Sequence, residues 1–177
     1  MRPVDLQPEA KAPTTAVIEA DLSRQDHAEA VVRLLDMYSR EPVANGAPLA
    51  PQVKRDLVDG LRSHPTSLVF LAYQNDRAVG LAVCFIGFST FAARRLINLH
   101  DVAVTPDARR LGVGRALLAA VEARAMQLDC CKLTLEVMND NLPAKRLYAD
   151  LGFAPYALET NTSTALLLQK KLGPRQP

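Results

Sequence analysis

The sequence predicts a mixed β-sheet with helices on both faces, an α/β or α+β fold. Segments favouring strands alternate with amphipathic segments in the order βααβββαβαβ. The composition is that of an ordinary globular protein, with 49% hydrophobic and 23% charged residues in a chain of 177. This length suits one domain, which we expect over 14–172, between a flexible leader at 1–13 and a short tail at 173–177.

The first half of the chain predicts a strand, two helices and a β-hairpin. Residues 14–20 favour a strand, and Ser23 is placed to cap a helix over 23–37. A second amphipathic helix is expected over 51–62, since apolar residues recur there at helical spacing. The hairpin consists of strands over 67–74 and 78–88, joined at Asn75-Asp76.

The second half predicts three further strands and two helices. A strand over 96–104 is followed by a long helix over 111–128, in which apolar residues recur at helical spacing. Next come a strand over 132–138 and a short helix over 142–151, which Gly152 ends. A last strand is expected over 165–171.

The start of the long helix has the composition of an anion-binding site. Glycines allow a ligand to approach the backbone closely, and free N–H groups of the first helical turn attract an anion together with the helix dipole. Arginines add fixed positive charge. We therefore expect this segment to bind a phosphorylated ligand through Arg109, Arg110, Leu111, Gly112, Val113, Gly114 and Arg115.

The glycines alone do not define the kind of phosphate site. A Walker loop is disfavoured because neither Lys nor Ser/Thr follows them. A dinucleotide fingerprint needs a third glycine where Leu117 stands, although Glu136 lies about as far downstream as a ribose-binding acid would. The glycines could also serve only the turn before a basic helix start.

Two motifs together resemble the GNAT superfamily of N-acetyltransferases. Arg109-x-x-Gly112-x-Gly114 is similar to its acyl-CoA loop, and Asn141-x-x-Ala144-x-x-Leu147-Tyr148-x-x-x-Gly152-Phe153 is similar to its second motif. The resemblance covers about residues 67–171. It implies a mixed, mostly antiparallel sheet of six to seven strands. It also implies acetyl-CoA as donor, direct transfer to a primary amine of a small or amino-acid-like acceptor, and a possible homodimer.

A finer likeness points to the diamine and polyamine acetyltransferase branch. Residues 87–91 and 99–104 look like segments of that branch, but His100 stands where the branch carries Glu. A neutral or positive group in that place attracts polycations less than a carboxylate does. We therefore expect monoamines, or amines bearing a carboxylate, to be better acceptors than spermidine or spermine.

The strand over 96–104 supplies the first candidate catalytic residue. Strict alternation puts Asn98, His100 and Val102 on one side of this strand, and Leu99 and Asp101 on the other. His100 is the candidate proton acceptor, because imidazole changes charge near neutral pH. A histidine merely packed in the sheet is the alternative, and we expect Asp101 to be mainly structural.

The resemblance assigns the remaining site residues. A backbone N–H of Val102, Ala103 or Val104 would polarise the thioester carbonyl. The phenol of Tyr148 would lie beside the cofactor sulfur and protonate the departing thiolate, or else Tyr148 belongs to the core. Asn141 would bind the pantetheine arm, cap the helix that starts at Leu142, or do both.

Several classes of function are disfavoured. Few aromatic residues, no Trp and a net charge of +2 give no support for binding nucleic acid. No apolar run is long enough to span a membrane, and Cys84, Cys130 and Cys131 fit reduced thiols, so we expect a cytoplasmic protein without a metal. A non-catalytic acyl-CoA-binding or sensor domain is the alternative to an enzyme.

Overall fold

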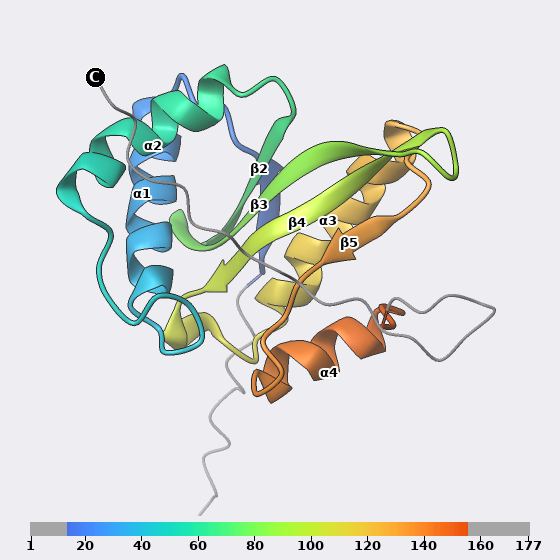
Figure 1. Cartoon of the computed structure of the whole chain (residues 1–177). Helices are drawn as coiled ribbons and strands as arrows, with labels where there is room; N and C mark the ends of the chain where they lie inside the picture. The colour runs from blue at the N-terminus through green and yellow to red at the C-terminus, as the bar shows by residue number, and fades with distance from the viewer. Residues whose placement is uncertain (1–13, 156–177) are drawn as a thin grey trace, which may run out of the picture.

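The computed structural model describes residues 14–155, where a five-stranded sheet has helices on both faces (Figure 1). The expected leader at 1–13, strand at 165–171 and tail at 173–177 lie outside these residues. None of the helices within 14–155 is both long and apolar enough to cross a membrane. In chain order the elements are β1 (Ala16–Glu19), α1 (Gln25–Ser39), α2 (Pro51–Ser63), β2 (Ser67–Gln74), β3 (Arg77–Ser89), β4 (Arg94–Val104), the 3₁₀ turn Pro106–Ala108, α3 (Val113–Gln127), β5 (Leu133–Leu135) and α4 (Leu142–Asp150).

The sheet is mixed and mostly antiparallel, as predicted. The spatial order is β1-β2-β3-β4-β5; β1 to β4 pair antiparallel, and β5 runs parallel to β4. The six to seven strands implied by the resemblance are not all seen, since the part of the chain that the structure describes contains five.

Two apolar clusters fill the two sides of the sheet. The central strands β2 and β3 are apolar on both faces, because both faces are covered by helices. On one face α3 contributes Leu117 and Val121, which are fully buried. On the other face α1 contributes Val31 and Leu34, and α2 adds Leu61. Figure 1 shows α1 and α2 on the opposite face of the sheet from α3.

The starts of two helices differ from the expected positions. Ser23 does not cap α1: its hydroxyl donates to Asp21, 2.6 Å away, and α1 begins at Gln25. Helix α3 begins at Val113 instead of residue 111. Arg110 and Gly112 have φ angles of +63° and +83°, in the left-handed region, which a right-handed helix cannot contain.

A β-bulge at His100 changes the direction of side chains along β4. Cys84 of β3 pairs with Leu99, whereas Val83 pairs with Asp101, so His100 is the extra residue. The expected alternation holds as far as His100, on the same side as Asn98, and is wrong for Asp101 and Val102. Asp101 takes the α1 side of the sheet together with Val83, and Val102 returns to the α3 side.

Strand β5 is shorter than the sequence predicts. It covers Leu133–Leu135 instead of 132–138, and its pairing with β4 ends at Leu99, directly before the bulge. A bulge bends and twists its strand, which turns β4 away from the line of β5. Within residues 14–155, β4 consequently has no strand partner on this edge from His100 to Val104.

Candidate active site

The first turn of α3 leaves backbone N–H groups available to a ligand. The N–H of Ala116 donates to the carbonyl of Gly112 at 3.0 Å. Those of Val113, Gly114 and Arg115 have no acceptor among the described residues, as the sequence predicts. A Cβ added to Gly112 would meet no atom within 4 Å, so the approach to this backbone is open. The positive end of a 15-residue helix points the same way.

Gly114 joins the two sequence motifs in space. A Cβ at this position would lie 3.0 Å from Cδ2 of Leu147 on α4, closer than side chains normally approach. Arg115 of α3 also reaches Asp150 of α4 at 3.3 Å. The absence of a side chain at Gly114 therefore allows α4, which carries Tyr148, to pack against the start of α3.

The three arginines around the start of α3 have different surroundings. Arg115 pairs with Asp150 on the exposed surface, where an ion pair contributes little to the stability of the fold. Arg110 is exposed and makes no ion pair or hydrogen bond with the described residues. Arg109 donates to Glu41 at 2.7 Å and to the carbonyl of Val104 at 3.2 Å. Arg110 is thus the cation with the most freedom to meet an anion here.

The end of β4 presents backbone rather than side chains. Ala103 is buried on the α1 side, and Val102 and Val104 pack against the cluster on the α3 side. What remains accessible is the edge that β5 does not cover. The arrangement suits the expected polarisation of a carbonyl by a backbone N–H of this segment.

His100 and Asp101 lie together on the α1 side. The exposed ring of His100 meets Phe85 edge to face, with ring centroids 5.6 Å apart. Asp101 is half-buried, and no described residue donates a hydrogen bond to its carboxylate. Burial raises the pKa of Asp101 above its ordinary value of 3.8, and the charge of His100 opposes this shift. Sequence reasoning missed this placement of Asp101, because it assumed strict alternation along the strand and did not anticipate the bulge at His100.

Tyr148 is half-buried on α4, and a second tyrosine lies near it. Burial raises the pKa of Tyr148, and Tyr38 raises it further. Burial likewise raises the pKa of Tyr38, followed by the negative charges of Asp101 and Glu41. Tyr38 was not among the predicted site residues, because it continues the apolar spacing of α1 and so resembles a core residue. Tyr38 packs on the α1 side of the sheet, as Asp101 does, whereas Tyr148 packs against the cluster on the α3 side.

Two other predicted site residues have simple local surroundings. The side-chain oxygen of Asn141 accepts from the N–H of Ala144 at 3.3 Å, which confirms the capping role. Leu111 is exposed in the turn before α3. Among residues 14–155, no three His, Cys, Asp or Glu side chains are grouped so that they could share a metal ion.

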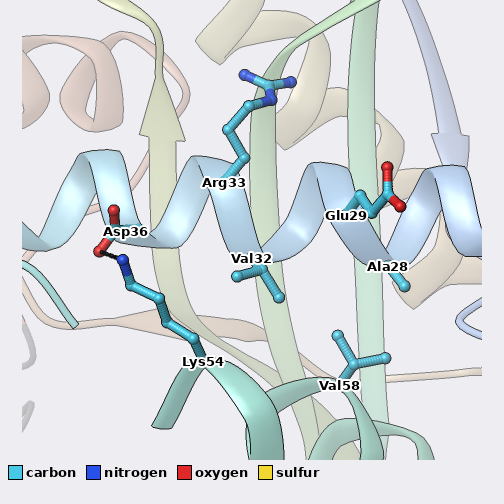
Figure 2. A pocket seen from close by; sticks show the side chains of 7 residues that line it. All are labelled: Ala28, Glu29, Val32, Arg33, Asp36, Lys54 and Val58. Atoms are coloured by element: carbon cyan, nitrogen blue, oxygen red, sulfur yellow. Dashed lines mark ion pairs between the residues drawn. The ribbon is translucent and has the colours of Figure 1, made fainter. Parts of the chain in front are cut away.

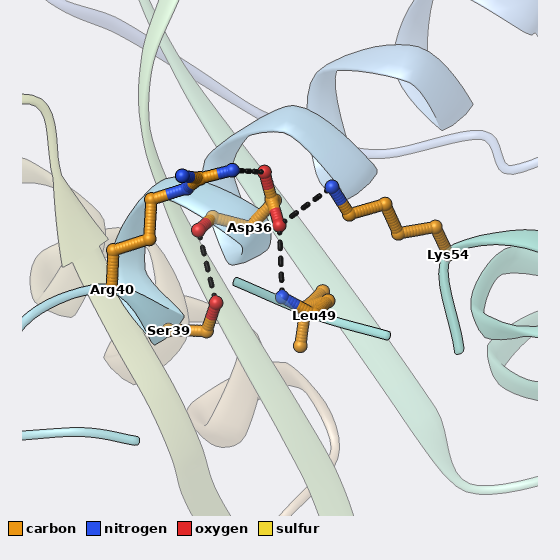
Figure 3. A network of polar contacts seen from close by, with 5 residues as sticks. All are labelled: Asp36, Ser39, Arg40, Leu49 and Lys54. Atoms are coloured by element: carbon orange, nitrogen blue, oxygen red, sulfur yellow. Dashed lines mark hydrogen bonds and ion pairs between the residues drawn. The ribbon is translucent and has the colours of Figure 1, made fainter. Parts of the chain in front are cut away.

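A groove of about 390 Å³ lies between α1 and α2 (Figure 2). Its lining includes Asp36 and Lys54, which form an ion pair at 2.8 Å. Asp36 also pairs with Arg40 at 2.9 Å and accepts from the N–H of Leu49 (Figure 3). These contacts tie the loop after α1 to both helices, so we assign them a structural role.

Comparisons with known proteins show the family of the chain. The model of the Acetyltransferase (GNAT) family matches residues 31–153. The chain is 33% identical over 98 residues to the uncharacterized N-acetyltransferase YhfO of Bacillus subtilis, across 52% of this chain and 66% of that protein. It is 33% identical over 79 residues to the thialysine N-epsilon-acetyltransferase of Bos taurus, across 45% and 46%. The match thus spans less than two thirds of either relative.

Solved structures share the fold. A probable acetyltransferase superposes with a TM-score of 0.72 at 21% identity, covering 88% of this chain and 99% of its own. An aminoglycoside N-acetyltransferase in complex with CoA superposes with a TM-score of 0.68 at 18% identity, covering 94% and 100%. Since the family match extends over more than half of the chain and includes both motifs, the protein belongs to the GNAT family of acyl-CoA-dependent N-acetyltransferases.

Proposed function

We propose that this protein transfers the acetyl group of acetyl-CoA to a primary amine by direct attack of the amine on the thioester. The observation that carries the proposal is the set of unpaired N–H groups at the start of α3, which α4 and Tyr148 adjoin through Gly114. Family membership supplies the donor, and this helix start has the features needed to bind its pyrophosphate.

The donor is bound mainly by backbone. The N–H groups of Val113, Gly114 and Arg115 face the pyrophosphate, and the side chains of Arg110 and Arg115 neutralise part of its charge. The uncovered edge of β4 at Val102–Val104 supplies an N–H to the thioester oxygen. Polarising that carbonyl makes its carbon more electrophilic.

The acceptor approaches from the α1 side of β4. His100 takes the proton that the amine must lose, because its ring is exposed and an imidazole nitrogen can accept a proton. The carboxylate of Asp101, which no described donor neutralises, stabilises the positive charge that results. The C–N bond forms as the C–S bond breaks, and the departing thiolate takes its proton from the phenol of Tyr148. A phenol is protonated at neutral pH even at its ordinary pKa of 10, and burial raises the pKa of Tyr148 further.

The acceptor is expected to be a small amine. The relative from Bos taurus is named for acetylation of an ε nitrogen, and the one from Streptomyces lavendulae for acetylation of streptothricin. His100 in place of the carboxylate of the polyamine branch still favours acceptors with a single ammonium group, or with a carboxylate, over spermidine and spermine.

A panel of amines tests the proposal. The purified protein is incubated with acetyl-CoA and one amine at a time, the release of free CoA thiol is followed, and the acetylated product is identified by mass. Release that depends on a monoamine is expected. A non-catalytic sensor domain would bind CoA without amine-dependent release, and that result would reject the enzyme. Spermine as the best acceptor would reject the specificity argument alone.

The variant His100→Gln separates proton transfer from packing. Gln keeps a polar side chain near Phe85 but cannot accept a proton in the neutral pH range. If His100 accepts the proton, the limb of the pH–rate profile on which activity rises with pH disappears in the variant. An unchanged limb would assign proton acceptance to another group.

A further inference from the structure

Arg109 connects two segments that are 68 residues apart in the sequence. It lies between β4 and α3, within the motif that resembles an acyl-CoA loop. Its terminal nitrogen donates to Oε1 of Glu41 at 2.7 Å, and its Nε donates to the carbonyl of Val104 at 3.2 Å. The guanidinium is therefore oriented from two sides, by the loop after α1 and by the end of β4.

Glu41 is itself held firmly by the turn that ends α1. Its N–H donates to the carbonyl of Tyr38 at 2.9 Å, and its own carbonyl accepts from Ala44 and Gly46. The Glu41 side chain is 24% exposed, against 45% for Arg109, so the carboxylate is the more enclosed partner. Its negative charge also contributes to the raised pKa of Tyr38.

We infer that Arg109 is a positioning residue, which fixes the end of α1 and Tyr38 against the end of β4 instead of binding the pyrophosphate. This inference rests on the proposed function, since it assigns Arg110 to the side of the site that binds the donor and Arg109 to the side that receives the acceptor. Arg110 is free to meet phosphate. If Arg109 bound phosphate instead, Glu41 would lose the one ion-pair partner that it has among the described residues. Removing the ion-pair partner of a partly enclosed carboxylate costs free energy, so Arg109 is expected to stay with Glu41 and not to move to the phosphate.

Removing Arg109 should therefore affect acceptor turnover and donor binding differently. Helix α1, which carries Tyr38, packs against β4 on the face where Asp101 lies, so loosening α1 should disturb acceptor turnover. The N–H groups that face the donor belong to α3, which the pair of Arg109 and Glu41 does not hold. Loss of Arg109 should therefore change acceptor kinetics while leaving the affinity for CoA nearly constant.

The test compares Arg109→Gln, Glu41→Gln, the double variant and the matched control Arg110→Gln. Calorimetric titration with CoA gives the donor affinity, and steady-state kinetics give kcat and KM for the best amine of the panel. Each single variant of the pair should lower kcat/KM for the amine about tenfold, and the double variant should be no worse than either single one. Arg109→Lys, which keeps the pair with Glu41, should recover part of the loss. CoA affinity should fall clearly only in Arg110→Gln.

Two patterns would overturn the inference alone. CoA affinity that falls in Arg109→Gln but not in Glu41→Gln would make Arg109 a phosphate ligand. Losses in acceptor kcat/KM that multiply in the double variant would show that the two residues act separately. A wild-type protein that does not bind CoA would overturn the proposed function, and this inference with it.

Discussion

His100 and Asp101 are consecutive in the sequence, yet both side chains lie on the α1 side of β4. The bulge produces this relationship: the register with β3 passes from Leu99 to Asp101, and His100 is left unpaired. Two titratable groups thereby meet on the face where Tyr38 also lies, while Val102 packs on the opposite face. A regular strand without a bulge would have placed His100 and Asp101 on opposite faces, with only one of the two on the acceptor side.

Asp101→Asn should make the protein more stable at pH 7 but less active. A raised pKa means that the folded state disfavours the ionised carboxylate, so above this pKa the charge costs free energy that the unfolded chain does not lose. Below the ordinary value of 3.8 the carboxyl is protonated in both states, and the cost vanishes. Thermal unfolding at several pH values should show a melting temperature raised by about 2–4 °C at pH 7, with the difference shrinking toward pH 4. A lower melting temperature at pH 7 would show that Asp101 is structural.

Asp36→Asn should have the opposite effect on stability. Lys54 and then Arg40 hold the pKa of Asp36 at about 2, so its contribution is complete above 3.8 and is lost as the pH falls from 3.8 toward 2. The side chain is 17% exposed, and solvent screening limits the loss at pH 7 to about 1 kcal/mol. Urea unfolding at pH 7 measures it. An unchanged free energy of unfolding would mean that the three contacts contribute nothing to the loop.

Gly112→Asp should weaken CoA binding more than Gly112→Asn does. Asn and Asp tolerate the left-handed conformation similarly, and nothing lies within 4 Å of a Cβ at this position, so the two variants differ chiefly in charge. A negative charge beside the N–H groups of Val113–Arg115 repels the pyrophosphate. We expect at least about tenfold weaker affinity for Asp than for Asn, measured by calorimetry at low salt. Equal affinities would move the phosphate site away from the start of α3.

Tyr148→Phe tests the proposed proton donor. Phe keeps the ring that packs against Phe153, with centroids 5.8 Å apart, and removes only the hydroxyl. Turnover should fall by about two to four powers of ten, with CoA affinity nearly unchanged. Single-turnover measurements are needed so that the chemical step is observed. Near-normal turnover in that experiment would return Tyr148 to the apolar core.

Much of the fold could be predicted because it depends on short-range patterns. The amphipathic spacing of α1, α2 and α3 and the continuous apolar runs of β2 and β3 are visible in short windows of the sequence. The helix start at Gly112 and the cap at Asn141 are also local, since they depend on backbone conformations and hydrogen bonds within a few residues.

Local sequence patterns are therefore sufficient for the family motifs and for the order of the elements within residues 14–155, and they indicate the helix start proposed to bind the donor. Tertiary contacts set which side chains surround the acceptor. The bulge at His100 and the early end of β5 arise from the pairing of β4 with strands on either side of it. The pairing of Arg109 with Glu41 joins residues distant in the chain. No local pattern encodes such contacts, because they form only when helices pack on both faces of the sheet and bring the end of α1 to the end of β4.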